Sequence, residues 1–142
     1  MRRPTTILAT TVARLILPFL LLFSLDLLLA GHNRPGGGFI AGVMLVAAIA
    51  LQYVVFGVAQ VRRRLPRGSL GLTATGLALA LGSGIPGLLR GEGFLKSWVI
   101  HWSLPLLGEV EWATAFIFDL GIFLLVAGVG LTLLALIGED RP

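Results

Sequence analysis

The chain has 142 residues, of which 56% are hydrophobic and 13% are charged, and its mean hydropathy is +0.95. Soluble globular chains carry about a quarter charged residues, and disordered chains combine low hydrophobicity with high charge. This composition excludes both classes and indicates a membrane protein. The net charge of +4 comes from basic residues that flank apolar segments, which indicates membrane topology and argues against nucleic-acid binding.

Four apolar segments have roughly the 20 residues that a membrane-spanning helix needs. They cover residues 7–30, 38–61, 68–89 and 113–138. The first contains Arg14 and Asp26, the last contains Asp119, and the two between them are uncharged. The sequence therefore predicts an all-α membrane protein with four transmembrane helices.

The first apolar segment follows Arg2 and Arg3, as the apolar part of a signal peptide would. The run is long, however, and no small-residue cleavage site ends it cleanly. We therefore expect an uncleaved spanning helix.

The basic residues also predict the orientation, because they concentrate in cytoplasmic loops. Seven of them lie at the two ends of the chain or between the second and third segments, against three in the other two loops. This distribution predicts that the N- and C-termini are cytoplasmic. Arg14 then lies near the cytoplasmic end of the first helix, where a long side chain can reach the interface.

The loop over residues 90–112, which this orientation places outside, contains all three tryptophans of the chain. Indole rings favour the membrane–water interface. Phe94, Trp98 and Trp102 recur every four residues, which places them on one face of a helix. We expect an amphipathic segment on the outer leaflet or, alternatively, an irregular loop that these rings anchor.

Two acidic residues fall within the predicted spans. Asp26 lies ~7 Å below the outer end of the first helix and Asp119 ~9 Å below that of the fourth, at ~1.5 Å per residue. Acids inside a membrane usually face a partner group or a water-filled cavity. Each therefore either lines a cation or proton path or forms a structural hydrogen bond, and nothing in the sequence shows that the two meet.

His32 ends the first segment on the outer side, where an imidazole could shuttle protons or cap the helix end. His101 is the only other histidine, and the chain has no cysteine. This donor set does not favour a zinc or haem site, and the sequence contains no P-loop or dinucleotide motif. We expect no cofactor and no bound metal.

A glycine-rich string connects the first two segments. Pro35 ends the first helix, and the three glycines after it permit backbone angles that other residues avoid. Gly38 and Gly42 form a G-x-x-x-G pair, which allows close contact between helices. The string lacks the lysine of a P-loop, so we interpret it as a tight turn that seats the second helix against a neighbour.

The string from His32 to Phe39 resembles the signature of the B subunit of Mrp-type (Mnh) multisubunit sodium/proton antiporters. Residues 107–110 and 114–121 are similar to the family's last helix and the stretch before it. The resemblance covers essentially the whole chain and favours a single domain over residues 1–142. Arg34 departs from the pattern as a bulkier, charged residue, which affects only local detail of the loop.

The resemblance implies an accessory subunit of a complex in the cell membrane of a prokaryote. Such complexes exchange cytoplasmic Na⁺ for external H⁺ at the expense of the proton-motive force. Their large A subunit resembles the proton-pumping subunits of respiratory complex I, and the accessory one docks beside it. The implied partners are this A subunit, subunits of the C to G types, the lipid bilayer and the transported ions.

The resemblance also implies roles for particular residues. The motif residues would shape the loop and contact another subunit; they are Pro35, Gly36, Gly37, Gly38, Phe39 and Gly42. Asp119 lies in the second motif and becomes the main candidate for an ion or proton relay, or for a buried bond between subunits. Asp26, outside both motifs, and His32 are further relay candidates.

The residues themselves also favour an accessory role. Two spans carry no charge and the halves of the chain show no internal repeat, whereas transporters that work alone normally have intramembrane polar groups and often repeats. The third segment is rich in glycine and alanine, which predicts close packing against other helices, in the same chain or in partners.

Two other classes of function stay open from the residues alone. One is a self-sufficient, homo-oligomeric ion transporter or channel with Asp26 and Asp119 at its site. The other is a membrane enzyme at the outer face, whose groups would be His32, His101, Glu109 and Glu111. We do not favour an enzyme, because no spacing supports a catalytic set.

Overall fold

The computed structural model describes residues 7–31, 37–62, 69–89, 91, 99–104 and 108–139. Four of its helices are long and apolar enough to cross a membrane, which confirms the four predicted spans. These spans are Ile7–Ala30, Gly38–Phe56, Ser69–Leu89 and Ala115–Ile137.

Two of the spans are interrupted or shortened by glycine. Helix α1 is Ile7–Ala30, α2 is Gly38–Phe56, α3 is Val58–Arg62, α4 is Ser69–Gly82, α5 is Ile85–Leu89 and α6 is Thr114–Glu139. Gly57 has a φ of +83°, which favours glycine, and it ends α2 before the predicted residue 61. A turn at Ser83 and Gly84 separates α4 from α5.

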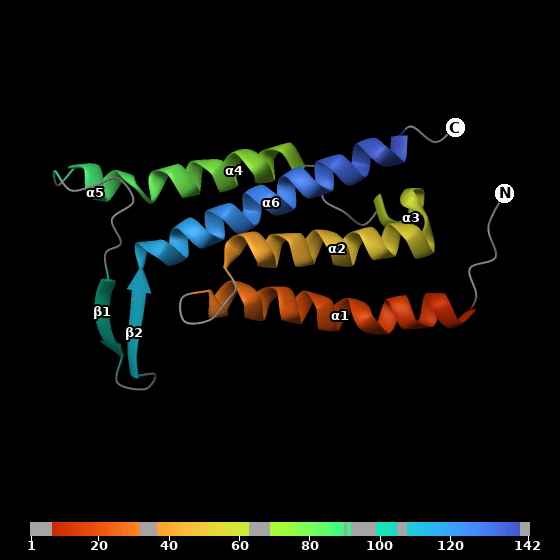
Figure 1. Ribbon diagram of the computed structural model, residues 1–142, viewed down its shortest axis with the longest axis horizontal. Helices are drawn as coiled ribbons and strands as arrows, with labels where there is room; N and C mark the ends of the chain where they lie inside the picture. The colour runs from red at the N-terminus through yellow and green to blue at the C-terminus, as the bar shows by residue number, and fades with distance from the viewer. Residues whose placement is uncertain are drawn as a thin grey trace.

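The spans pack side by side in the order α1, α2, α6, α4, and α1 and α4 form the two edges of this layer (Figure 1). Helix α1 begins and α6 ends at the same end of the layer, where α3 also lies. Helix α5 and a β-hairpin lie at the opposite end. The C-terminal helix is therefore central, between α2 and α4.

The hairpin consists of β1, Val99–Leu104, and β2, Gly108–Ala113, which pair antiparallel with Val99 opposite Ala113. The expected helical segment is thus wrong over these residues, and Phe94 and Trp98 lie outside the described part. The physical reason is the alternation of polar and apolar residues from Glu109 to Trp112, which is the period of a strand.

Helices α4 and α6 approach each other so closely that their backbones touch. A Cβ atom on Gly76 would lie 2.6 Å from the carbonyl oxygen of Gly121, and one on Gly121 would lie 2.6 Å from the amide nitrogen of Ala80. Such contacts are possible only without a side chain in between. The small residues of α4 therefore pack against another helix as predicted, and that helix belongs to the same chain.

Helices α1 and α2 are joined by two buried side-chain hydrogen bonds. The Ser24 hydroxyl donates to the carbonyl oxygen of Ala41, and the Gln52 amide donates to the carbonyl oxygen of Ala13, each at 2.8 Å. Hydrogen bonds between membrane helices contribute roughly 0.6–2 kcal/mol each. The two bonds are far apart along the helices, so they fix α1 on α2 at two levels of the membrane.

Candidate functional site

Asp119 lies where the start of α6 meets the connection between α1 and α2. It is partly buried. A Cβ atom on Gly31 would lie 3.1 Å from one of its carboxylate oxygens, and one on Gly37 would lie 3.8 Å from both. The carboxylate therefore faces the backbone at both ends of the connection, and we call Gly31, Gly37 and Asp119 the acidic corner.

The backbone of Gly37 holds the connection in place. Its φ of +100° lies in the region that favours glycine. Its N–H donates to the carbonyl oxygen of Leu27 at 3.0 Å, and its own carbonyl accepts from the amide of Ala41 at 3.1 Å. Gly37 thus ties the last turn of α1 to the first turn of α2, beside the Asp119 carboxylate.

The G-x-x-x-G pair seats α2 directly on α6. A Cβ atom on Gly38 would overlap the carbonyl oxygen of Asp119, and one on Gly42 would lie 2.8 Å from Cβ of Val126. The predicted close contact is present, and the neighbour is a helix of the same chain. Both glycines are buried there.

Phe39 differs from the glycines on either side of it in the motif. Its side chain is 62% exposed, although it follows the buried Gly38 directly, and that of the next residue, Ile40, is 46% exposed. The motif therefore has one buried set of residues that positions α2 and one exposed aromatic side chain that is available for a contact outside the chain.

The two intramembrane acids occupy different surroundings. Asp26 is exposed on α1, whereas Asp119 faces the acidic corner. Within the described part of the chain, no hydrogen bond or ion pair joins them. The structure thus places Asp119 beside the glycine-rich connection, whereas Asp26 is exposed on the surface of an edge helix.

The structure describes only some of the other predicted site residues. His32, Pro35 and Gly36 lie outside the described residues. His101 occupies a position in β1 opposite Glu111 in β2, and Glu109 lies opposite Ser103. The backbone register thus pairs the two strands that carry three of the four residues of the hypothetical enzyme site, His101, Glu109 and Glu111.

The sequence interpretation missed two residues that the structure shows to be important, Ser24 and Gln52. Each is buried and bonds to the backbone of the facing helix. The signal that could have found them is a polar side chain inside an otherwise apolar span, because such a group needs a partner in lipid.

Comparisons with known proteins agree on one family. A family model described as a domain related to the MnhB subunit of Na⁺/H⁺ antiporters matches residues 8–132. The B subunit of the Na⁺/H⁺ antiporter of Alkalihalophilus pseudofirmus is 40% identical over 134 residues, which cover 94% of this chain and 93% of that relative. Its counterpart of the same name from Bacillus subtilis is 39% identical over 131 residues, 92% of each chain.

A solved structure has the same fold. The Mrp complex from Dietzia sp. DQ12-45-1b contains a chain that matches all of this chain with a TM-score of 0.78 and 31% sequence identity. This chain spans 16% of the length of that chain. The four-span fold therefore also occurs as part of a longer polypeptide.

We expect Gly38→Val to destabilise the chain, because the added side chain overlaps the Asp119 carbonyl and pushes α2 away from α6. Overpacking of this kind costs about 1–3 kcal/mol. The measurement is the thermal unfolding midpoint, with the yield of folded chain in mild detergent. Gly71→Val is the matched control, because a Cβ atom on Gly71 of α4 meets nothing within 4 Å. Equal losses in both variants would contradict the prediction.

Proposed function

The chain belongs to the MnhB family, and we propose that it is the accessory B-type component of a multisubunit Na⁺/H⁺ antiporter. The observation that carries this proposal is its match to the corresponding antiporter components over more than nine-tenths of both chains. It is a multi-pass membrane protein. In this function the complex exports Na⁺ in exchange for H⁺, driven by the proton-motive force.

The packing supports a subunit that works within a larger assembly. Most residues of these spans are not buried inside the chain: three of the 24 residues of α1 and six of the 19 residues of α2 are buried. Among the described helices, each edge helix packs against a neighbouring span on one side, so its other side is open to lipid or another protein (Figure 1). The partners in this proposal are the large A subunit and the C- to G-type subunits.

The exposed Phe39 is the motif residue best placed to contact a partner. We expect Phe39→Ala to lower several-fold the amount of large polytopic subunits that co-purify with the tagged chain, because an exposed aromatic side chain carries much of a contact's energy. The measurement is purification from native membranes in mild detergent, followed by mass identification.

The matched control is Leu70→Ala, which removes a similarly exposed apolar side chain from α4. Unchanged co-purification with Phe39→Ala would exclude the contact. Recovery of the wild-type chain alone, with ion flux in liposomes, would instead support a self-sufficient transporter and contradict the accessory role.

We also propose that both termini are cytoplasmic, in the plasma membrane of a prokaryote. The start of α1, the end of α6 and α3, which ends at Arg62, share one end of the layer (Figure 1). In the sequence, the segments that adjoin these three helix ends hold the majority of the basic residues, and such residues favour the cytoplasmic side.

Because the chain has no cysteine, single cysteines can test this orientation. A membrane-impermeant maleimide added to intact cells is expected to label Ser97→Cys and to leave Pro142→Cys unlabelled until the cells are opened. Labelling of Pro142→Cys in intact cells would reverse the proposed orientation.

Asp119 is proposed as a relay group at the acidic corner. Its carboxylate lies beside Gly31, the residue that precedes the relay candidate His32 in the sequence. Asp26 is the second acidic candidate and lies on the exposed side of α1, where a partner could approach it.

We expect Asp119→Asn to lower Na⁺/H⁺ antiport several-fold in everted vesicles, because an amide of the same shape cannot release or accept a proton at neutral pH. The amount of assembled complex is expected to stay normal. Asp140→Asn serves as control, since it removes a carboxylate near the end of the chain. Unchanged antiport at all pH values tested would make Asp119 a structural residue.

A further inference from the structure

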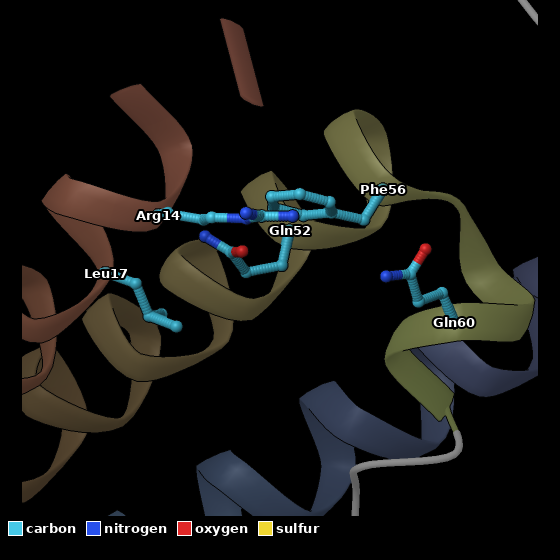
Figure 2. Close-up of a pocket in the computed structure, with 5 residues that line it drawn as sticks. All are labelled: Arg14, Leu17, Gln52, Phe56 and Gln60. Atoms are coloured by element: carbon cyan, nitrogen blue, oxygen red, sulfur yellow. The ribbon is translucent and has the colours of Figure 1, made fainter. Parts of the chain in front are cut away.

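A pocket with three polar side chains (Figure 2) lies where α1, α2 and α3 meet, at the end of the layer opposite the acidic corner (Figure 1). It has a volume of about 400 Å³, within the usual size range of small-molecule sites. Its walls come from α1, α2 and α3, and its lining residues are Arg14, Leu17, Gln52, Phe56 and Gln60. We propose that this pocket binds the phosphate group of an anionic phospholipid.

The charge of the pocket favours an anion. Arg14 is the only charged residue in the lining, and its guanidinium stays protonated in proteins. A charged side chain within a spanning helix normally pairs with another group. In the described ranges, no ion pair to Arg14 is present, so its charge is available to a ligand.

The geometry of Arg14 leaves its hydrogen-bond donors available. Its guanidinium carbon lies over the Phe56 ring, 5.3 Å from the ring centre (Figure 2). The ring stabilises one face of the cation. The N–H groups point outward in the guanidinium plane, which is the arrangement that binds phosphate oxygens in pairs.

Two glutamines complete the polar lining. The Gln52 amide donates to the carbonyl oxygen of Ala13 at 2.8 Å, which fixes this side chain between α1 and α2. Gln60 reaches the pocket from α3 and adds an amide donor from the other side (Figure 2). It can do so because Gly57, with its φ of +83°, breaks the helix and turns α3 across the end of α2.

The depth of the pocket favours a lipid phosphate over a soluble anion. Helix α2 has 19 residues and is therefore about 28 Å long, close to the ~30 Å hydrocarbon thickness of a bilayer. Phe56 is its last residue, so a bilayer matched to α2 would place the guanidinium above the ring at the hydrocarbon boundary, next to the phosphate layer. Leu17, three residues deeper than Arg14, offers an apolar wall to the glycerol and acyl chains.

The position in the layer gives lipid direct access. Arg14 is exposed on α1, which is an edge helix, and the neighbouring Leu15 and Ile16 are exposed as well. A basic pocket between membrane helices, open to the bilayer, is a recurring site for anionic headgroups. A carboxylate from another subunit is the competing occupant, and the experiment separates the two.

The test uses the purified full-length chain in a neutral detergent, with native mass spectrometry to measure bound lipid. Dioleoyl-phosphatidylglycerol is titrated against dioleoyl-phosphatidylcholine, with inorganic phosphate as the soluble competitor. We expect the wild type to prefer phosphatidylglycerol, and Arg14→Gln to weaken that binding about five-fold, as expected for one arginine near an anionic lipid surface.

Two further variants sharpen the result. Arg14→Lys keeps the charge but loses the planar, paired donors, so its affinity is expected to lie between those of the wild type and Arg14→Gln. Arg141→Gln removes the same charge from another part of the chain and is expected to bind like the wild type.

Three results would overturn the proposal. The first is equal phosphatidylglycerol binding by the wild type and Arg14→Gln. The second is displacement of the lipid by millimolar inorganic phosphate, which would make the pocket a site for soluble anions. The third is unchanged lipid binding together with loss of a co-purifying subunit in Arg14→Gln, which would assign the pocket to a partner's carboxylate. The lipid measurement does not depend on antiport.

Discussion

Close approach of backbones on both sides of α6 is the contact on which the rest of the structure depends. On one side, Gly38 leaves room for the carbonyl of Asp119; on the other, Gly76 and Gly121 allow α4 and α6 to touch. Apolar helices gain little from contact with each other in lipid, because lipid tails are equally apolar. Dispersion contacts between closely spaced backbones, which glycine permits, stabilise the packing of the helices instead.

The same contact positions the candidate site. The close contact at Gly38 fixes the position of α2 along α6. Gly37, next to it, donates a hydrogen bond to the last turn of α1. The Asp119 carboxylate therefore lies beside both ends of the connection between α1 and α2. Gly37 and Gly38 of the motif thus position the helices, whereas most of the Phe39 side chain is exposed and available for a contact outside the chain. One short string of residues thus has two functions, one within the chain and one directed to a contact outside it.

Hydropathy and spacing predicted the four spans and the close seat of α2, because these features depend on local sequence. The lateral order of the helices could not be predicted, since sequence gives the depth of a residue but not its neighbours. Asp26 and Asp119 have similar predicted depths, yet α2 lies between α1 and α6. The hairpin was missed because the spacing of three aromatic residues outweighed the alternation in 109–112.

The two halves of the membrane carry different chemistry in this chain. An acidic side chain from α6 and a tight glycine connection lie at one end of α2, and an arginine over an aromatic ring lies at the other. Both places involve the same pair of helices, α1 and α2, which Ser24 and Gln52 hold together. A rigid pair of this kind keeps the two ends at a fixed separation.

The arrangement of the spans as a layer one helix thick also has a geometric consequence. In the part of the chain that the structure describes, such a layer has two broad faces and encloses no lumen of its own (Figure 1). A watery passage along either face would therefore be bounded on its far side by another molecule. The two faces of the layer can then have different neighbours, with protein against one face and lipid against the other.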